Sequence, residues 1–179
     1  MESLLSLPLP LPEPVAGWDG FTYIGWPASA LMLQSSMSIS TSLSVIMSAY
    51  TWSRAQEALS QAVGLDPDPF DDTLLEYQNP LTGGPALPTI GTAIQTLRPG
   101  AKCKPHRHTG SVVYYVVRGQ GTTVIDGKRY EWSKGDFLAL PPWAVHAHEN
   151  RSSNADAVLF QVNDIPVLKS LGLYREEAA

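Results

Sequence analysis

Residues 100–119 read GAKCKPHRHTGSVVYYVVRG, and residues 135–150 read GDFLALPPWAVHAHEN. Each stretch contains one His-x-His pair, at 106–108 and at 146–148, and the two pairs account for all four histidines of the chain. Side chains two residues apart on a β-strand point to the same side of the sheet. If both pairs lie on strands, each can direct two imidazoles into one cavity, where imidazole suits iron, zinc, copper or nickel. On spacing alone, a structural role for the histidines stays equally open.

Several short segments with β-strand character surround the two histidine pairs. The segment 111–117 is β-branched and aromatic on both faces, so we expect it to be buried on both sides. Asp126-Gly127 joins two further segments and is a strong signal for a two-residue hairpin. Many short strands with regular turns are typical of a sandwich or small barrel. The expected strands are 89–97, 111–117, 122–125, 128–132, 137–140 and 157–162, followed by a short helix over 166–171.

The first part of the chain has a different character. Residues 1–51 are rich in proline and then in serine, nearly free of charge and without periodicity. Ser53 and Gln56 match a capping box, and Gly64 follows as a helix stop. We therefore expect an irregular N-terminal arm over 1–72, with a short helix near 54–63, and one β domain over 73–179.

Composition excludes several classes of function. A chain of 179 residues can bury a core without covalent staples. Its net charge of −5 and its lack of a basic cluster argue against nucleic-acid binding. The single cysteine, Cys103, cannot form an internal disulfide, and no stretch has the sustained apolar length of a membrane span. We expect a cytoplasmic protein that binds neither nucleic acid nor membrane.

The spacing of glycines and prolines around the histidines resembles the two motifs of the cupin superfamily. The matching residues are Gly100, His106, His108 and Gly119 in the first motif, and Gly135, Pro141, His146 and Asn150 in the second. The resemblance implies a single cupin, a double-stranded β-helix or jelly-roll barrel, with short flanking helices. Two positions depart from the pattern. Val112 occupies the slot where the first motif usually has a glutamate ligand, and Trp143 stands where the second usually has glycine.

With both departures, the sequence resembles one subgroup of cupins, the gentisate 1,2-dioxygenases. The likeness extends over Asn79-Pro80-Leu81-Thr82-Gly83-Gly84-Pro85, HRHT at 106–109 and PWAVHAH at 142–148. Enzymes of that family hold Fe(II) with three histidines and no carboxylate, and open the ring of gentisate with O₂. The resemblance implies Fe(II) as cofactor and His106, His108 and His146 as its ligands and catalytic residues. The implied substrate is gentisate or a related 2-hydroxyaryl carboxylate.

The resemblance covers one barrel, whereas gentisate dioxygenases are usually bicupins with two barrels in one chain. This sequence matches the second barrel. Two alternatives to a complete dioxygenase therefore stay open: a non-catalytic metal-binding cupin with a binding or regulatory role, and a half-enzyme that lacks the N-terminal cupin. We expect a homo-oligomer, a dimer or higher.

Four further residues are candidates for substrate binding. Ligand sites are rich in aromatic side chains, which makes Trp143 and Tyr115 candidates. Trp143 lies beside the second motif, and Tyr115 belongs to an expected strand. His148 is a candidate for a contact near the metal, and Gln95 is a polar residue in an otherwise apolar strand. For each of them a plain core or surface role stays open.

Overall fold

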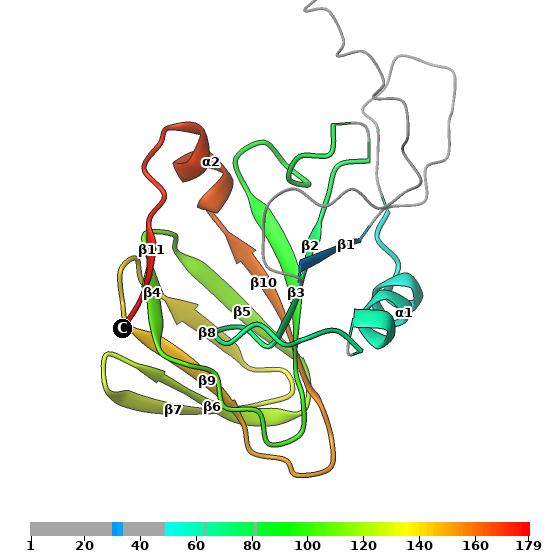
Figure 1. Cartoon of the computed structure of the whole chain (residues 1–179), viewed down its shortest axis with the longest axis vertical. Coiled ribbons are helices and arrows are strands. Elements are labelled where there is room, and N and C mark those ends of the chain that lie inside the picture. Colours follow the sequence, from blue (N-terminus) through cyan, green and yellow to red (C-terminus); the bar gives the residue numbers. More distant parts are fainter. Residues whose placement is uncertain (1–29, 34–48, 63, 81) are drawn as a thin grey trace, which may run out of the picture.

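A computed structural model describes residues 30–33, 49–62, 64–80 and 82–179 (Figure 1). Neither helix of this part is long and apolar enough to cross a membrane. The elements are β1 (Ala30–Leu33), α1 (Trp52–Ala62), β2 (Thr73–Tyr77), β3 (Gly91–Leu97), β4 (His106–His108), β5 (Val112–Arg118), β6 (Gln120–Ile125), β7 (Lys128–Ser133), β8 (Phe137–Leu140), β9 (His146–Asn150), β10 (Ala157–Asn163), α2 (Ile165–Ser170) and β11 (Glu176–Ala178).

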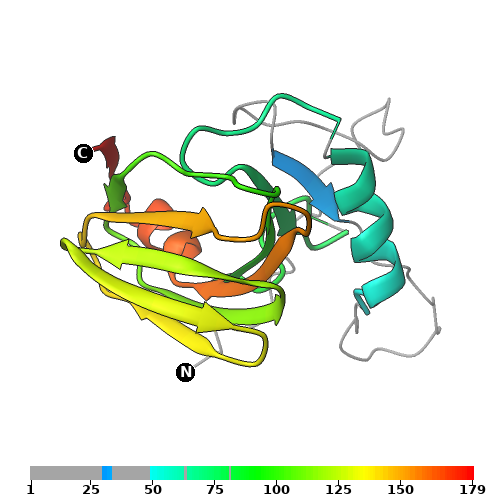
Figure 2. The same ribbon diagram turned by 90° about the horizontal axis from the view of Figure 1, so that it is seen from below.

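The strands form two sheets that face each other, as the view from below shows (Figure 2). One sheet has six strands in the order β1-β2-β3-β10-β5-β8, and the other has five in the order β11-β4-β9-β6-β7. All pairings are antiparallel except that of β1 with β2. The predicted all-β architecture is confirmed. Because β4 and β9 are neighbours in the smaller sheet, both His-x-His pairs belong to that sheet.

The turn between β6 and β7 has the geometry that the sequence predicts. Asp126 and Gly127 have φ angles of 47° and 77°, as a two-residue hairpin turn of this kind requires. The turn is also tied to the segment that leads into β9. The backbone N–H of Asp126 donates to the carbonyl of Val145, and the Val145 N–H donates to Oδ1 of Asp126, at 2.8 and 2.9 Å. The hairpin therefore fixes the entry of the second histidine pair.

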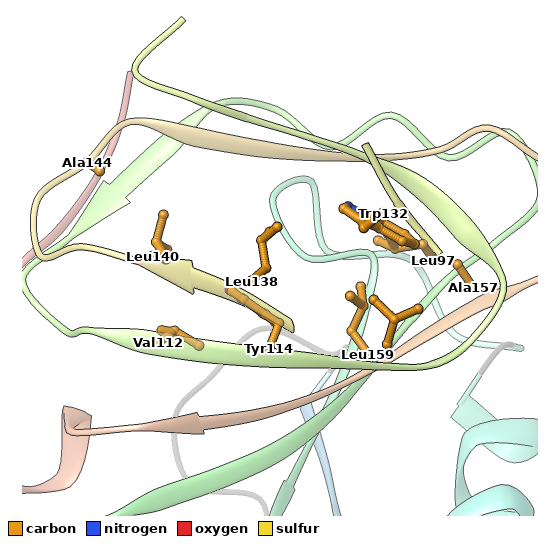
Figure 3. Packing of buried hydrophobic residues seen from close by; sticks show 10 residues of the cluster. Leu97, Val112, Tyr114, Trp132, Leu138, Leu140, Ala144, Ala157 and Leu159 are labelled. Atoms are coloured by element: carbon orange, nitrogen blue, oxygen red, sulfur yellow. The ribbon is translucent and has the colours of Figure 1, made fainter. Parts of the chain in front are cut away.

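Apolar side chains fill the space between the sheets (Figure 3). Tyr114 and Val112 of β5 meet Trp132 of β7 and Leu97 of β3 there. Gly119 lets β5 turn into β6 beside this core: its φ is +88°, and a Cβ at this position would lie 2.7 Å from Cα of Ala157. The core cluster extends along the space between the sheets, from Ala144 near one end to Ala157 near the other (Figure 3).

Helix α1 covers part of the outer face of the larger sheet. Ala55, Leu59 and Ala62 pack against a cluster that includes Leu75 and Ile94. The helix begins at Trp52, two residues before the expected range, and Val63 lies outside the described residues. Ser53 is inside the helix, so its expected role as the N-cap is wrong.

The expectation that 111–117 is buried on both sides is also wrong. Residues of β5 alternate: Val112, Tyr114 and Val116 face the interior, whereas Val113 is 47% exposed. The physical reason is that α1 covers only the β2–β3 side of the outer face, so β5 has a partly open face. Strand β11, which the sequence analysis did not predict, pairs with β4.

Candidate metal centre

Three of the four histidines meet at one point between the sheets. His106 and His108 come from β4 and His146 from β9, with His106 directly opposite His146 in the register of the two strands. One ring nitrogen from each lies within 4.8 Å of the others. The three residues are 1%, 6% and 1% exposed, respectively. The structure therefore brings together the three residues that the sequence predicted as ligands.

Backbone carbonyls fix the tautomer of two of these rings. Nδ1 of His108 lies 2.9 Å from the carbonyl oxygen of Gly110, and Nδ1 of His146 lies 3.0 Å from that of Ala144. A carbonyl only accepts hydrogen bonds, so Nδ1 carries the proton and Nε2 keeps its lone pair. Such a contact on the second ring nitrogen is a regular feature of histidines that bind metals.

The remaining nitrogens fit a metal ion. Nε2 of His146 is buried and has no hydrogen-bond partner in the described part of the chain. A buried polar atom without a partner is unfavourable, so this nitrogen points to a missing group that accepts its lone pair. Three imidazoles suit a transition metal, and a set of three leaves coordination positions for other ligands.

The imidazoles are held in the neutral form that metal binding needs. Burial is the main cause that lowers the pKa of His106 and of His108. Burial, followed by the neighbouring His106, lowers the pKa of His146 to about 2. Since ligand nitrogens must be deprotonated, the site is ready for a metal ion at neutral pH.

The ligand strand β4 is held by the C-terminal strand β11. Glu176 is the register partner of His108, and Ala178 that of His106. Between the two ligands, Arg107 forms an ion pair with Glu177 and places its guanidinium 4.7 Å from the centre of the Trp143 ring. Arg107 therefore links β4, β11 and the segment before β9 on the side away from the metal ligands.

Trp143 is partly exposed at the edge of this centre. Its side chain is 39% exposed, its φ is +65°, and its backbone N–H donates to the carbonyl of His108 at 2.7 Å. The ring lies beside Arg107 rather than among the imidazoles.

His148 points into the same interior but is not one of the three ligands. Its ring centre lies 5.8 Å from that of His146 and 5.0 Å from that of Tyr114. Nδ1 is 2.8 Å from Oγ1 of Thr123, which also accepts the indole N–H of Trp132 at 2.9 Å. The Thr123 hydroxyl can then donate its own proton to Nδ1, which leaves the proton of the neutral imidazole on Nε2. That Nε2 is buried and has no partner among the described residues.

The structure separates the two tyrosines of β5. Tyr115 lies on the outer face of the sheet, where its ring is 5.0 Å from that of Phe137, so it is not brought to the metal centre. Tyr114 faces inward. The inward position of Tyr114 was predictable from the sequence. Val112 occupies the ligand slot of the first motif and so faces inward, and Tyr114, two residues later on the same strand, shares its face.

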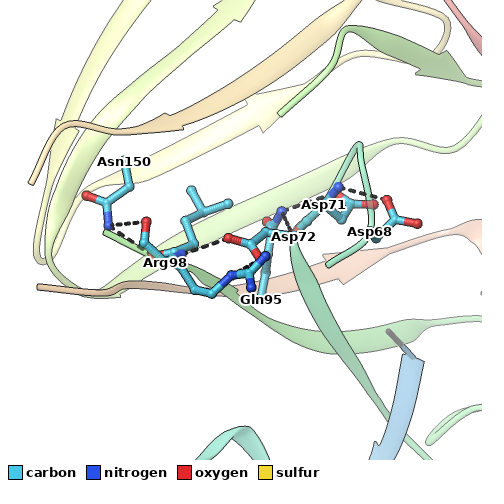
Figure 4. A network of polar contacts seen from close by, with 7 residues as sticks. Asp68, Asp71, Asp72, Gln95, Arg98 and Asn150 are labelled. Carbon is cyan, nitrogen blue, oxygen red and sulfur yellow. Dashed lines mark hydrogen bonds and ion pairs between the residues drawn. The ribbon is translucent and has the colours of Figure 1, made fainter. Parts of the chain in front are cut away.

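Gln95 faces inward as expected and belongs to a polar network that the sequence analysis missed (Figure 4). Its Nε2 donates to the carbonyl oxygen and to Oδ1 of Asp71, at 2.9 and 3.1 Å. The neighbouring Asp72 is buried and binds Arg98 through both the backbone N–H and Nε, each at 2.8 Å. Nothing in the spacing of this aspartate-rich turn pointed toward Gln95.

Comparison with known proteins identifies the domain. Residues 93–163 match the family model described as the cupin domain. This segment is a cupin domain. The structure of a salicylate 1,2-dioxygenase from Pseudaminobacter salicylatoxidans has the same fold, with a TM-score of 0.68 and 24% identity over 78% of this chain and 41% of that one. The predicted jelly-roll cupin fold is confirmed.

Several curated relatives of this cupin are named as 1,2-dioxygenases of aromatic acids. A 5-aminosalicylate 1,2-dioxygenase from Comamonas sp. is 45% identical over 131 residues, which are 72% of this chain and 34% of the relative. A gentisate 1,2-dioxygenase from Haloferax sp. is 34% identical over 71% of this chain and 35% of the relative. The predicted resemblance is confirmed. The chain spans about a third of the length of these two relatives.

Proposed function

We propose that this cupin is an Fe(II)-dependent dioxygenase that cleaves the ring of gentisate or a related 2-hydroxyaryl carboxylate with O₂. The observation that carries the proposal is the group of three buried imidazoles, of which one ring nitrogen each lies within 4.8 Å of the others. An Fe(II) ion held by His106, His108 and His146 would supply the activation of O₂ and bind the aromatic acid.

The ligand set favours an anionic substrate. The metal-binding group found in the described residues consists of histidines alone, so no ligand carboxylate reduces the charge of a divalent ion. A carboxylate beside a ring oxygen is the substrate chemistry that such a centre attracts. Val112, in the slot of the usual glutamate ligand, is buried in the apolar core instead.

The surrounding residues would orient the substrate and exclude water. With Nε2 protonated, His148 is a buried hydrogen-bond donor beside the ligands, and we assign it a contact to an oxygen of the aromatic acid. Gln95 would contact the ring from the opposite sheet, whereas Trp143 receives no role here because its ring lies beside Arg107, away from the metal ligands. Tyr115 has no place in this proposal, because it lies on the outer face of its sheet.

Oxygen uptake tests the proposal. The protein is reconstituted with Fe(II) without air and then given O₂ and gentisate, salicylate, 5-aminosalicylate or 1-hydroxy-2-naphthoate. We expect uptake with at least one of these acids, and loss of uptake in His106→Ala. Protein that contains one Fe(II) per site and consumes no O₂ with any of them refutes the dioxygenase proposal.

A second candidate follows from the length of the chain. The chain spans about a third of the length of two curated relatives, and the alternative proposal is a cupin that binds metal and ligand without turnover, or one that becomes active on association with another copy. Binding of the aromatic acid without O₂ uptake would support the first of these. Uptake that rises with protein concentration, together with a dimer in sedimentation, would support the second.

A further inference from the structure

The two strands that carry the metal ligands are held unequally. β9, which carries His146, lies in the middle of its sheet and pairs with β6 over five register positions. β4, which carries His106 and His108, meets β9 at a single register position. Its other partner is β11, with which it pairs over three positions. The strand with two of the three ligands therefore depends mainly on β11 for its pairing.

The β11 segment, residues 174–179, lies alongside β4 (Figure 1) and is bonded to it at both ends. At one end, the backbone N–H of Thr109 donates to the carbonyl of Arg175 at 2.9 Å, and the N–H of Arg175 donates to Oγ1 of Thr109 at 3.0 Å. At the other end, the N–H of Ala179 donates to the carbonyl of Pro105 at 3.1 Å. The hydrogen bonds of the β11 segment thus extend over the full length of the ligand strand.

Little apolar burial supports this attachment. All three residues of β11 are exposed. The side-chain bond to β4 is the ion pair of Glu177 with Arg107, and exposed ion pairs contribute little to stability. Tyr174 is half-buried, but its hydroxyl donates to Oε2 of Glu176 within the segment itself, at 2.8 Å. Segments with few buried apolar contacts open locally more easily than the core unfolds, so we expect β11 to detach from β4 while the barrel stays folded.

Detachment of β11 would leave β4 in place but less firmly oriented. The N–H of Cys103 donates to the carbonyl of His148 at 2.9 Å, and the N–H of Trp143 donates to the carbonyl of His108 at 2.7 Å. These bonds join β4 and the segment before it to β9 and the segment that leads into it. They do not involve β11. The loss of three ladder positions would therefore loosen the two imidazoles of β4 without unfolding the domain.

We propose that β11 is a positioning strand for the metal centre: when attached, it holds both imidazoles of β4 in place, and when detached, it lets the metal ion leave. The inference rests on the metal centre of the proposed function and does not depend on turnover. A bound ion joins β4 to β9 through the three ligands, so it favours the position of β4 that β11 also requires. By linkage, the factor by which attached β11 raises metal affinity equals the factor by which bound metal favours attachment.

Hydrogen exchange of the whole chain, with and without excess Zn(II), measures this coupling. The probes are the N–H groups of Thr109 and Ala179, one at each end of the β11 segment, followed by NMR. The reference is the N–H of Gly135, which donates to the carbonyl of Val116 in the other sheet at 2.9 Å. We expect zinc to slow exchange at both probes by at least about tenfold, the lower end of what support around the ligands contributes to metal affinity. The reference should stay nearly unchanged.

Release of Zn(II) into excess chelator tests the same coupling from the side of the metal. Glu177→Pro keeps the length of the chain but removes the backbone donor of the middle residue of β11, and proline cannot donate to a strand ladder. We expect this variant to release zinc about 10- to 100-fold faster than the wild-type protein. Glu177→Gln is the matched control. It loses only the exposed ion pair with Arg107 and should release zinc at nearly the wild-type rate.

The outcomes separate the inference from the proposed function. Zinc that binds but leaves exchange at Thr109 and Ala179 unchanged overturns the inference and leaves the metal centre intact, as does a folded Glu177→Pro protein that releases zinc at the wild-type rate. Wild-type protein that binds no zinc overturns both the inference and the proposed function. If Glu177→Pro does not fold, the exchange measurement on the wild-type protein decides the matter alone.

Discussion

Replacing Thr123 by valine tests the hydrogen-bonded chain that orients His148. The buried Thr123 hydroxyl accepts the indole N–H of Trp132 and contacts Nδ1 of His148. Valine has nearly the same shape but can do neither. The indole N–H then stays buried without an acceptor, and the imidazole loses the partner that determines its tautomer.

The expected loss of stability follows from these contacts. An unsatisfied buried donor costs about 1–3 kcal/mol, and the bond to His148 is worth about 1 kcal/mol. The added methyl group offsets about 0.8 kcal/mol of this through apolar burial. We expect Thr123→Val to lower the free energy of unfolding by about 2 kcal/mol, which corresponds to about 1 M in the urea midpoint for a slope near 2 kcal/mol/M.

A double-mutant cycle isolates the shared hydrogen bond. Trp132→Phe removes the indole N–H, so Thr123→Val should cost about 1–2 kcal/mol less in that background than in the wild-type protein. Urea unfolding of the four proteins measures this difference, and ¹⁵N NMR of His148 reports whether the proton leaves Nε2 in the valine variant. Equal losses in the two backgrounds would refute the reasoning.

Three other changes test the site and its support. His146→Ala should reduce metal affinity by more than about 100-fold, since outer-shell partners alone contribute 10–100-fold. His148→Ala should retain the metal. Metal content after dialysis distinguishes the two variants. Burial lowers the pKa of His146 to about 2 and of His148 to about 3, so below pH about 6.5 the unfolded chain binds protons that the folded chain does not. The metal-free protein should therefore lose stability as the pH falls from about 6.5 toward 4, by up to about 1.4 kcal/mol per pH unit for each histidine, and a flat profile in urea titrations would contradict this. Asp72→Ala removes two hydrogen bonds to Arg98 and should destabilise the fold by about 2–4 kcal/mol; an unchanged melting temperature would show that the pair contributes little.

The grouping of the three histidines was predictable from the resemblance to the cupin motifs, since the His-x-His spacing alone left a structural role open. His-x-His on a strand fixes which side chains share a face, and the glycine and proline spacing placed both pairs in one fold. The Asp126-Gly127 turn was predictable because its conformation depends on two adjacent residues.

What sequence reasoning missed depends on contacts between distant segments. The face of Tyr115 follows from the parity of its strand, whereas aromatic type alone does not distinguish it from the inward-facing Tyr114. Strand β11 pairs with β4 about 70 residues earlier, as the Arg107–Glu177 bond shows, and no short-range pattern announces such a partner. The bond between Gln95 and Asp71 also joins separate elements, so neither residue signals the other in the sequence.

The period-two arrangement of the ligands limits how this chain can change in length. His106 and His108 lie on a strand of three residues, and His146 faces His106 across a single register pair. Inserting or deleting one residue within β4 or β9 would turn the ligands that follow it toward the opposite face of the sheet. Length variation that preserves the centre is therefore confined to the connecting segments. In a set of homologous sequences, gaps inside the His-x-His strands would mark the loss of metal binding even where all the histidines remain.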